Sequence, residues 1–183
     1  GFIGSNLIDK ILKKNQIVIC IDNLSSGSIK NINEFLDNKK FTFIEGDINL
    51  EQNFIVDRIW HLASNPSPNS YQKKPVETLK TSFLGTLNML NMAKKNNAKL
   101  LFSSTSEIYG EPNSFPTKEE YFGNLNPLSV RGCYGEGKRV AETLCYDFFR
   151  TYGIDVKIAP TSKALGINIG LSPRTSSSPI TLG

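Results

Sequence analysis

The chain has 183 residues, of which 39% are hydrophobic and 21% are charged. This composition suits a folded domain with an apolar core and excludes a disordered or low-complexity chain. No apolar run approaches the roughly 20 residues that a membrane-spanning helix needs, and a net charge of +4 is too small to indicate nucleic acid binding. The chain contains three cysteines, which we expect to be reduced in a cytoplasmic protein. Whether a membrane anchor precedes Gly1 is left open.

Strands and helices are expected to alternate over residues 1–159. Helical patterns are predicted at residues 6–14, in a short segment ending near residue 36, and at residues 75–96 and 134–152. Apolar runs that end in a small or polar residue predict buried parallel strands at residues 17–21, 41–44, 58–62, 99–103 and 155–159. This alternation predicts an α/β fold with a doubly wound, Rossmann-like parallel sheet. Residues 160–183 lose the periodicity and are expected to be mostly coil, with no assigned function.

Two glycines precede the first predicted helix. Gly1 and Gly4 match the second half of a dinucleotide-binding fingerprint, in which glycines let the backbone approach a pyrophosphate, although a capping turn would look the same. Asp22 ends the next strand, where a carboxylate can accept hydrogen bonds from ribose hydroxyls and would repel a 2′-phosphate. The pattern therefore predicts NAD rather than NADP. Asp47, at the following strand end, is either an adenine-binding residue or a turn residue.

A tyrosine and a lysine lie four residues apart at the start of the last predicted helix. This spacing places Tyr134 and Lys138 on one helical face. An ammonium group near a phenol favours the phenolate and lowers a pKa of about 10, so Tyr134 could act as a general base at a sugar hydroxyl. The preceding strand ends in hydroxyl residues that could share the proton. His61, the only histidine, is interpreted as structural.

These motifs, in this order, resemble the extended short-chain dehydrogenases, the NAD-dependent epimerase/dehydratase family. The resemblance extends from Gly1 to about Ala159. Within the family, residues 105–110 and 131–143 are most similar to the members that decarboxylate UDP-glucuronate. The first strand of the family fold and its C-terminal substrate domain have no counterpart in this chain. We therefore expect residues 1–159 to form an incomplete NAD-binding domain.

The resemblance implies roles for the matching positions. Tyr134 would be the base, and Lys138 its partner on the nicotinamide ribose. The remaining NAD contacts would come from Gly1, Phe2, Ile3, Gly4, Asp22, Asn23, Ser25, Ser26, Asp47, Ile48, Leu62, Ser64 and Thr81. The reacting sugar would contact Thr105, Ser106 and Glu107, with Lys80 and Asn88 as further substrate-binding candidates. No metal site is expected.

The resemblance implies a lyase in the complete protein, which would convert UDP-glucuronate to UDP-xylose through a 4-keto intermediate, as a homodimer. A sugar 4-epimerase, a 4,6-dehydratase and an inactive dinucleotide-binding fragment stay open as alternatives, and this chain alone is expected to be inactive. Ser82 stands where the family usually has Asn, Ser26 where it has Thr, and Pro160 where it has Arg. Related dehydratases carry an Asp-Glu pair where this chain has Ser106 and Glu107, so the single carboxylate favours decarboxylation.

Overall fold

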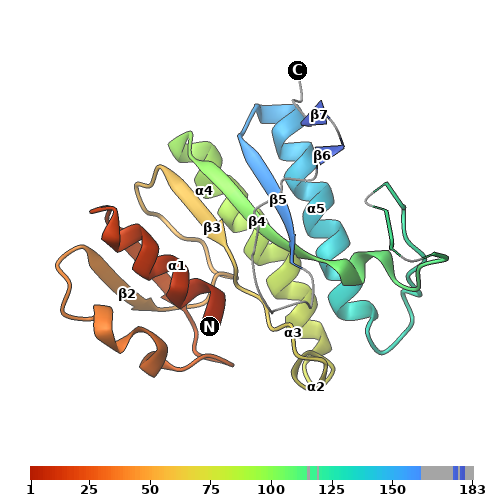
Figure 1. Cartoon of the computed structure of the whole chain (residues 1–183), viewed down its shortest axis with the longest axis horizontal. Coiled ribbons are helices and arrows are strands. Elements are labelled where there is room, and N and C mark those ends of the chain that lie inside the picture. Colours follow the sequence, from red (N-terminus) through yellow and green to blue (C-terminus); the bar gives the residue numbers. More distant parts are fainter. Residues whose placement is uncertain (115, 119, 162–174, 177, 180–183) are drawn as a thin grey trace. The chain divides into compact units, whose positions relative to one another are not determined.

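The computed structural model describes residues 1–114, 116–118, 120–161, 175–176 and 178–179. The chain divides into two compact units, Gly1–Leu50 and Glu51–Gly183, and each is considered by itself. Each unit contains parallel strands and helices, as expected for an α/β Rossmann-like fold (Figure 1). Most of the predicted C-terminal coil lies outside the described residues.

The first unit is a two-stranded parallel sheet with a helix and a 3-10 turn. Its elements are α1 (Phe2–Lys13), β1 (Val18–Asp22), η1 (Ile29–Phe35) and β2 (Phe41–Glu45), with Val18 opposite Phe41. The apolar face of α1 buries Ile8 and Ile11, as its periodicity predicts. The short helix near residue 36 is 3-10 rather than α, and it contains two asparagines, which are weak α-helix formers.

The second unit contains a three-stranded parallel sheet in the order β3-β4-β5. Its strands are β3 (Arg58–His61), β4 (Lys99–Thr105) and β5 (Val156–Thr161). Strand β4 pairs along both edges, and its Leu100 and Phe102 are almost fully buried, as expected for the middle strand of a covered sheet. β5 runs to Thr161, two residues beyond the predicted strand. Within the predicted coil, β6 (Thr175–Ser176) and β7 (Ser178–Pro179) form a short antiparallel pair.

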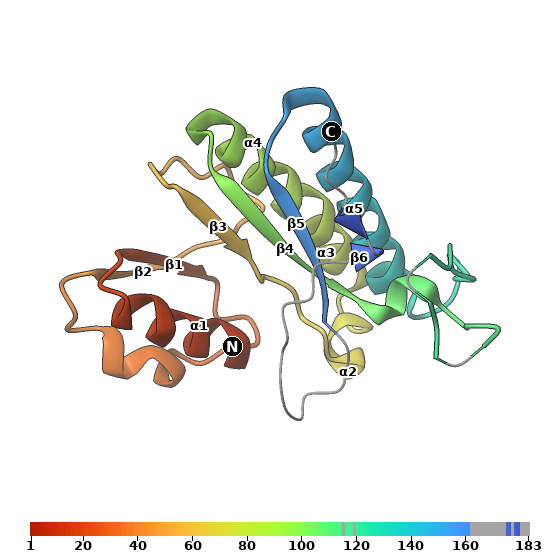
Figure 2. The same ribbon diagram turned by 45° about the horizontal axis from the view of Figure 1, so that its top comes forward.

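Helices lie together on one face of this sheet (Figure 2). The predicted helix at residues 75–96 is one helical run of three parts: α3 (Pro75–Lys80), a π-helical turn η2 (Thr81–Gly85) and α4 (Thr86–Asn96). The last long helix, α5 (Gly132–Tyr152), packs against all three parts and against β4. Two short helical segments were not expected: α2 (Pro68–Tyr71) and the 3-10 turn η3 (Ser106–Tyr109).

Small residues on α5 allow its close packing against η2. A Cβ added to Gly137 would lie 2.9 Å from both Cβ and Oγ of Ser82. Ser82 is buried, and its Oγ has no hydrogen-bond partner in the described part of the chain. A larger side chain at either position would therefore separate the two helices.

Candidate functional site

The strongest candidate site lies at the carboxyl end of β4, where α5 begins. Thr105 is the last residue of β4, and its Oγ1 accepts a hydrogen bond from the main-chain N–H of Glu107 at 3.2 Å, which caps η3. Tyr134 is the third residue of α5 and is only 4% exposed. The carboxyl ends of parallel strands are the usual place for ligands in α/β folds.

The Tyr134 phenol is held by two other hydroxyl residues. It forms side-chain hydrogen bonds with Thr105 and Ser64, and both favour the phenolate. Burial outweighs them, and with the Glu107 charge it raises the pKa of Tyr134 above its usual value. The structure thus brings Tyr134, Thr105, Ser64 and Glu107 together. The expected lowering of the Tyr134 pKa by Lys138 is wrong for this structure, because desolvation dominates.

Lys138 is buried one turn further along α5. It is 3% exposed, and its Nζ donates to the main-chain oxygen of Ser103 at 2.7 Å while lying 4.7 Å from the centre of the Phe102 ring. Burial lowers the pKa of Lys138 to about 8. Its ammonium group is therefore directed to β4.

Tyr71, which sequence reasoning did not identify, lies against Tyr134. The two rings stack with centroids 4.9 Å apart and an interplanar angle of 6°. The Tyr71 hydroxyl donates to Glu107 Oε2 at 3.2 Å, and the residue is 1% exposed. Burial and Glu107 raise the pKa of Tyr71 to about 12. The only sequence signal was Ser67-Pro68, a pair typical of a helix start.

The segment that follows η3 folds back onto α5. Arg139 donates from Nη1 to the main-chain oxygens of Ile108 and Phe122, at 3.3 and 3.2 Å. Gly110 forms a β-bridge with Asn124 and has φ +61°, and a Cβ there would lie 2.1 Å from the Asn124 oxygen. This return of the chain fixes the position of η3, and with it Glu107, beside Tyr134.

The remaining predicted site residues of the second unit lie on several different elements. Ser106 is exposed at the start of η3. Lys80 is half exposed at the end of α3 and forms an ion pair with Glu77 at 3.3 Å. Leu62 follows β3, Thr81 begins η2, and Asn88 lies half-buried on α4.

The cofactor candidates of the first unit lie at three chain turns. Gly1 is the N-cap of α1, and Phe2, Ile3 and Gly4 form its first turn. Asp22 is the last residue of β1, and Asn23, Ser25 and Ser26 follow it. Asp47 and Ile48 follow β2. Asp22 Oδ1 accepts the N–H of Leu24 at 2.8 Å, and Asp47 Oδ1 accepts that of Asn49 at the same distance. Gly27 lies against the Asp22 carboxylate, since a Cβ there would be 3.4 Å from Oδ2.

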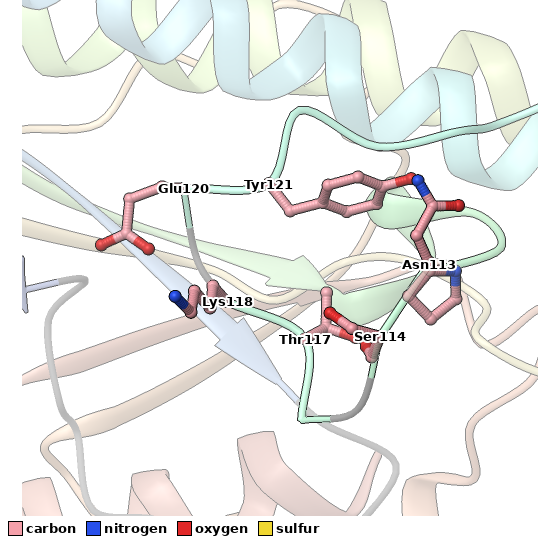
Figure 3. Close-up of a pocket in the computed structure, with 7 residues that line it drawn as sticks. Asn113, Ser114, Thr117, Lys118, Glu120 and Tyr121 are labelled. Carbon is pink, nitrogen blue, oxygen red and sulfur yellow. Dashed lines mark hydrogen bonds between the residues drawn. The ribbon is translucent and has the colours of Figure 1, made fainter.

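Two open cavities lie elsewhere. One of about 260 Å³ lies in the loop after η3, where Tyr121 and Asn113 face each other (Figure 3). The other, of about 230 Å³, is a polar hollow between α1 and η1 that includes Asp9 and Glu34. Neither contains a predicted site residue. Within the described residues, no group of His, Cys, Asp and Glu could hold a metal ion, and no helix is long and apolar enough to span a membrane.

Comparison with known proteins identifies the family. The family model described as GDP-mannose 4,6 dehydratase matches residues 1–172. The chain belongs to this family. It is 48% identical over 161 residues to UDP-glucuronic acid decarboxylase 3 of Arabidopsis thaliana, covering 87% of this chain and 47% of the relative. It is 44% identical over 167 residues to UDP-glucuronic acid decarboxylase 1 of Xenopus tropicalis, covering 91% of this chain and 39% of the relative.

Solved structures of similar proteins agree with this family. A UDP-glucose 4-epimerase from Thermotoga maritima, solved with UDP-glucose, superimposes with a TM-score of 0.76 at 30% identity, over 87% of this chain and 52% of that one. A UDP-glucuronic acid 4-epimerase from Bacillus cereus, solved with NAD, gives 0.73 at 27% identity, over 88% and 54%. The chain thus spans about half the length of these family members or less. The extended short-chain dehydrogenase resemblance and the Rossmann-like fold are confirmed.

Proposed function

We propose that this chain supplies the NAD-binding residues and the proton-transfer residues of a lyase that converts UDP-glucuronate to UDP-xylose. The observation that carries the proposal is the buried Tyr134 phenol, hydrogen-bonded with Thr105 and Ser64 beside the Glu107 carboxylate. The identity of 44–48% to several UDP-glucuronic acid decarboxylases supports the choice of reaction.

The residues present fit NAD. Asp22 offers a carboxylate for ribose hydroxyls, and Gly27 leaves the space beside it without a side chain. The start of α1, formed by residues 1–4, offers main-chain N–H groups for the pyrophosphate. Asn23, Ser25, Ser26, Asp47, Ile48, Leu62, Ser64, Thr81, Tyr134 and Lys138 would complete the contacts. When bound, NAD would supply the hydride acceptance and return that a 4-keto route requires.

Tyr134 would accept the proton of the sugar C4 hydroxyl, with Thr105 sharing the hydrogen bond. In this structure the phenol is protonated at neutral pH, because burial raises its pKa. A base role therefore requires further stabilisation of the phenolate. We propose that Lys138, one turn further along α5, supplies it.

The arrangement of Ser106 and Glu107 favours decarboxylation over dehydration. Dehydration expels hydroxide, a poor leaving group, and needs an acid to protonate it. A serine hydroxyl is too weak an acid for this step, and the only carboxylate of the pair, Glu107, accepts a hydrogen bond from Tyr71. Carbon dioxide leaves as a neutral molecule from a 4-keto acid and needs no acid.

Lys80 and Asn88 are proposed to bind the nucleotide-sugar substrate.

A UDP-sugar 4-epimerase is the second candidate, favoured by the superposition with two such enzymes. The experiment that separates the candidates uses the complete product of the gene with UDP-glucuronate, UDP-glucose and dTDP-glucose. We expect UDP-xylose and carbon dioxide from UDP-glucuronate and little change in the other two. A 4-epimer without carbon dioxide would support the epimerase, and a 4-keto-6-deoxy product the dehydratase. NAD binding without turnover of any substrate would support an inactive dinucleotide-binding protein.

Assembly, location and domain limits are further parts of the proposal. We propose a homodimer that covers the apolar residues exposed on the α3–η2 run and on α5, which include Val76, Phe83 and Val140. Light scattering of the complete protein tests this. We propose residues 1–159 as the NAD-binding domain, with no site in residues 160–183. A cytoplasmic location is supported by three cysteines that are all free.

A further inference from the structure

Tyr71 occupies an unusual position for a residue on a four-residue helix. Its backbone oxygen accepts from two directions: from Thr78 Oγ1 at 3.4 Å and from Cys133 Sγ at 3.9 Å. These contacts join the end of α2 to both α3 and the start of α5. The backbone of Tyr71 is thus held in place independently of the contacts that its ring makes.

The ring and the hydroxyl of Tyr71 contact two different candidate site residues. The ring lies parallel to that of Tyr134, with centroids 4.9 Å apart, so that the Tyr134 ring cannot tilt toward α2. The hydroxyl donates to Glu107 Oε2 at 3.2 Å. Tyr71 is 1% exposed, so the donor of this hydrogen bond is shielded from water, while the Glu107 carboxylate is partly exposed.

The hydroxyl is a permanent donor over the working pH range. Burial and the neighbouring Glu107 carboxylate raise the pKa of Tyr71 to about 12, so the proton stays on Tyr71 at any pH at which the protein works. Tyr71 is therefore unsuited to proton transfer itself. It can only orient the groups that it contacts.

We propose that Tyr71 is a positioning residue that couples Glu107 to Tyr134, holding the carboxylate by a hydrogen bond and the phenol by ring stacking. The inference rests on the proposed function for its kinetic consequence only. The coupling of Tyr71 to Glu107 is a property of the folded chain and can be tested without turnover.

The first test is a kinetic cycle in the complete gene product. Tyr71→Phe keeps the stacked ring and removes the hydroxyl; we expect kcat to fall about tenfold, with KM and NAD affinity nearly unchanged, because misplacement acts on the chemical step. Glu107→Gln should cost more. The double variant should be no slower than Glu107→Gln alone, because Tyr71 acts through Glu107. Tyr146→Phe, at an exposed tyrosine of α5, is the matched control and should not change kcat.

The second test is independent of activity. In protein labelled with ¹³C at the tyrosine ζ carbon, NMR titration follows each phenol, with Tyr71→Phe assigning the Tyr71 signal. Glu107→Gln should lower the pKa of Tyr71, because the carboxylate's charge and its hydrogen bond both raise it. Additive losses in the kinetic cycle, or an unchanged Tyr71 titration, would overturn the coupling. Failure of the proposed function would appear separately, as absence of turnover on UDP-glucuronate with the titration shift intact.

Discussion

The ammonium group of Lys138 on α5 donates a hydrogen bond to the main-chain carbonyl of Ser103 on β4, at 2.7 Å, and Lys138 is almost completely buried. The bond satisfies one of the three donors of the ammonium group. Charge burial is nevertheless unfavourable, and it lowers the pKa of Lys138 to about 8. Burial of the Lys138 charge thus lowers the stability of the fold, although this residue is proposed to act on the cofactor.

We predict that Lys138→Met has a pH-dependent effect on stability. The folded pKa of about 8 lies below the unfolded value of 10.5, so the charged lysine destabilises wild type fully below pH 8, and this loss disappears as pH rises to 10.5. The stability of Lys138→Met relative to wild type should therefore fall by on the order of 1–3 kcal/mol across that window. Urea unfolding at pH 7 and pH 10 measures it. Lys10→Met, at an exposed lysine, is the control; an equal change in both variants would contradict the prediction.

Tyr134→Phe is expected to lower kcat at least about 100-fold in the complete protein while keeping NAD binding, since it removes only the hydroxyl that transfers the proton. The stacking on Tyr71 should survive, because phenylalanine keeps the ring. Steady-state kinetics and NAD titration by fluorescence check both parts. Tyr152→Phe, at a half-exposed tyrosine at the end of α5, is the control. Near-normal turnover of Tyr134→Phe would assign the proton transfer to another group.

His61→Gln should make the fold less sensitive to acid. His61 is buried, its Nε2 lies 3.0 Å from Thr86 Oγ1, and burial together with Lys138 lowers its pKa to about 3. Below pH 6.5 the unfolded chain binds a proton that the folded chain does not, so wild type loses on the order of 2 kcal/mol between pH 6.5 and 4.5 from this group. Glutamine can still hydrogen-bond Thr86 and has no such titration. Urea midpoints at pH 7.5 and 4.5 should converge in the variant, and an unchanged difference would sink the idea.

Gly110→Ala is expected to destabilise the protein by at least about 3 kcal/mol. Gly110 has φ +61° and ψ −128°, and an added Cβ would lie 2.1 Å from the main-chain oxygen of Asn124, which cannot move without breaking the β-bridge. Gly153→Ala is the matched control, because Gly153 also has a positive φ, of +69°, but has no atom within 4 Å of the added Cβ. That variant should cost about 1 kcal/mol. Thermal melts with equal losses for both would contradict the steric argument.

The strands and the main helices could be predicted because their signals are local. Each apolar run became a strand, and Thr105 and Tyr134 met because they lie at a strand end and at a helix start on the same edge. Tyr71 could not be predicted, because its partner Tyr134 is distant in the sequence and no periodicity links a short helix to a distant ring. The Ser103 acceptor of Lys138 was also missed, since it depends on which buried polar group lies within reach of a long side chain.

The π-helical turn at residues 81–85 has a consequence for the whole run from Pro75 to Asn96. One extra residue in a turn advances everything after it by about 100° around the helix axis. The side chains of α3, which are all at least partly exposed, and the α4 residues Met89, Leu90 and Ala93, which are buried, are therefore set in different rotational phases. Deletion of a single residue within this turn would rotate the Leu90 face away from the sheet. The length of this turn therefore sets which side of α4 faces the sheet.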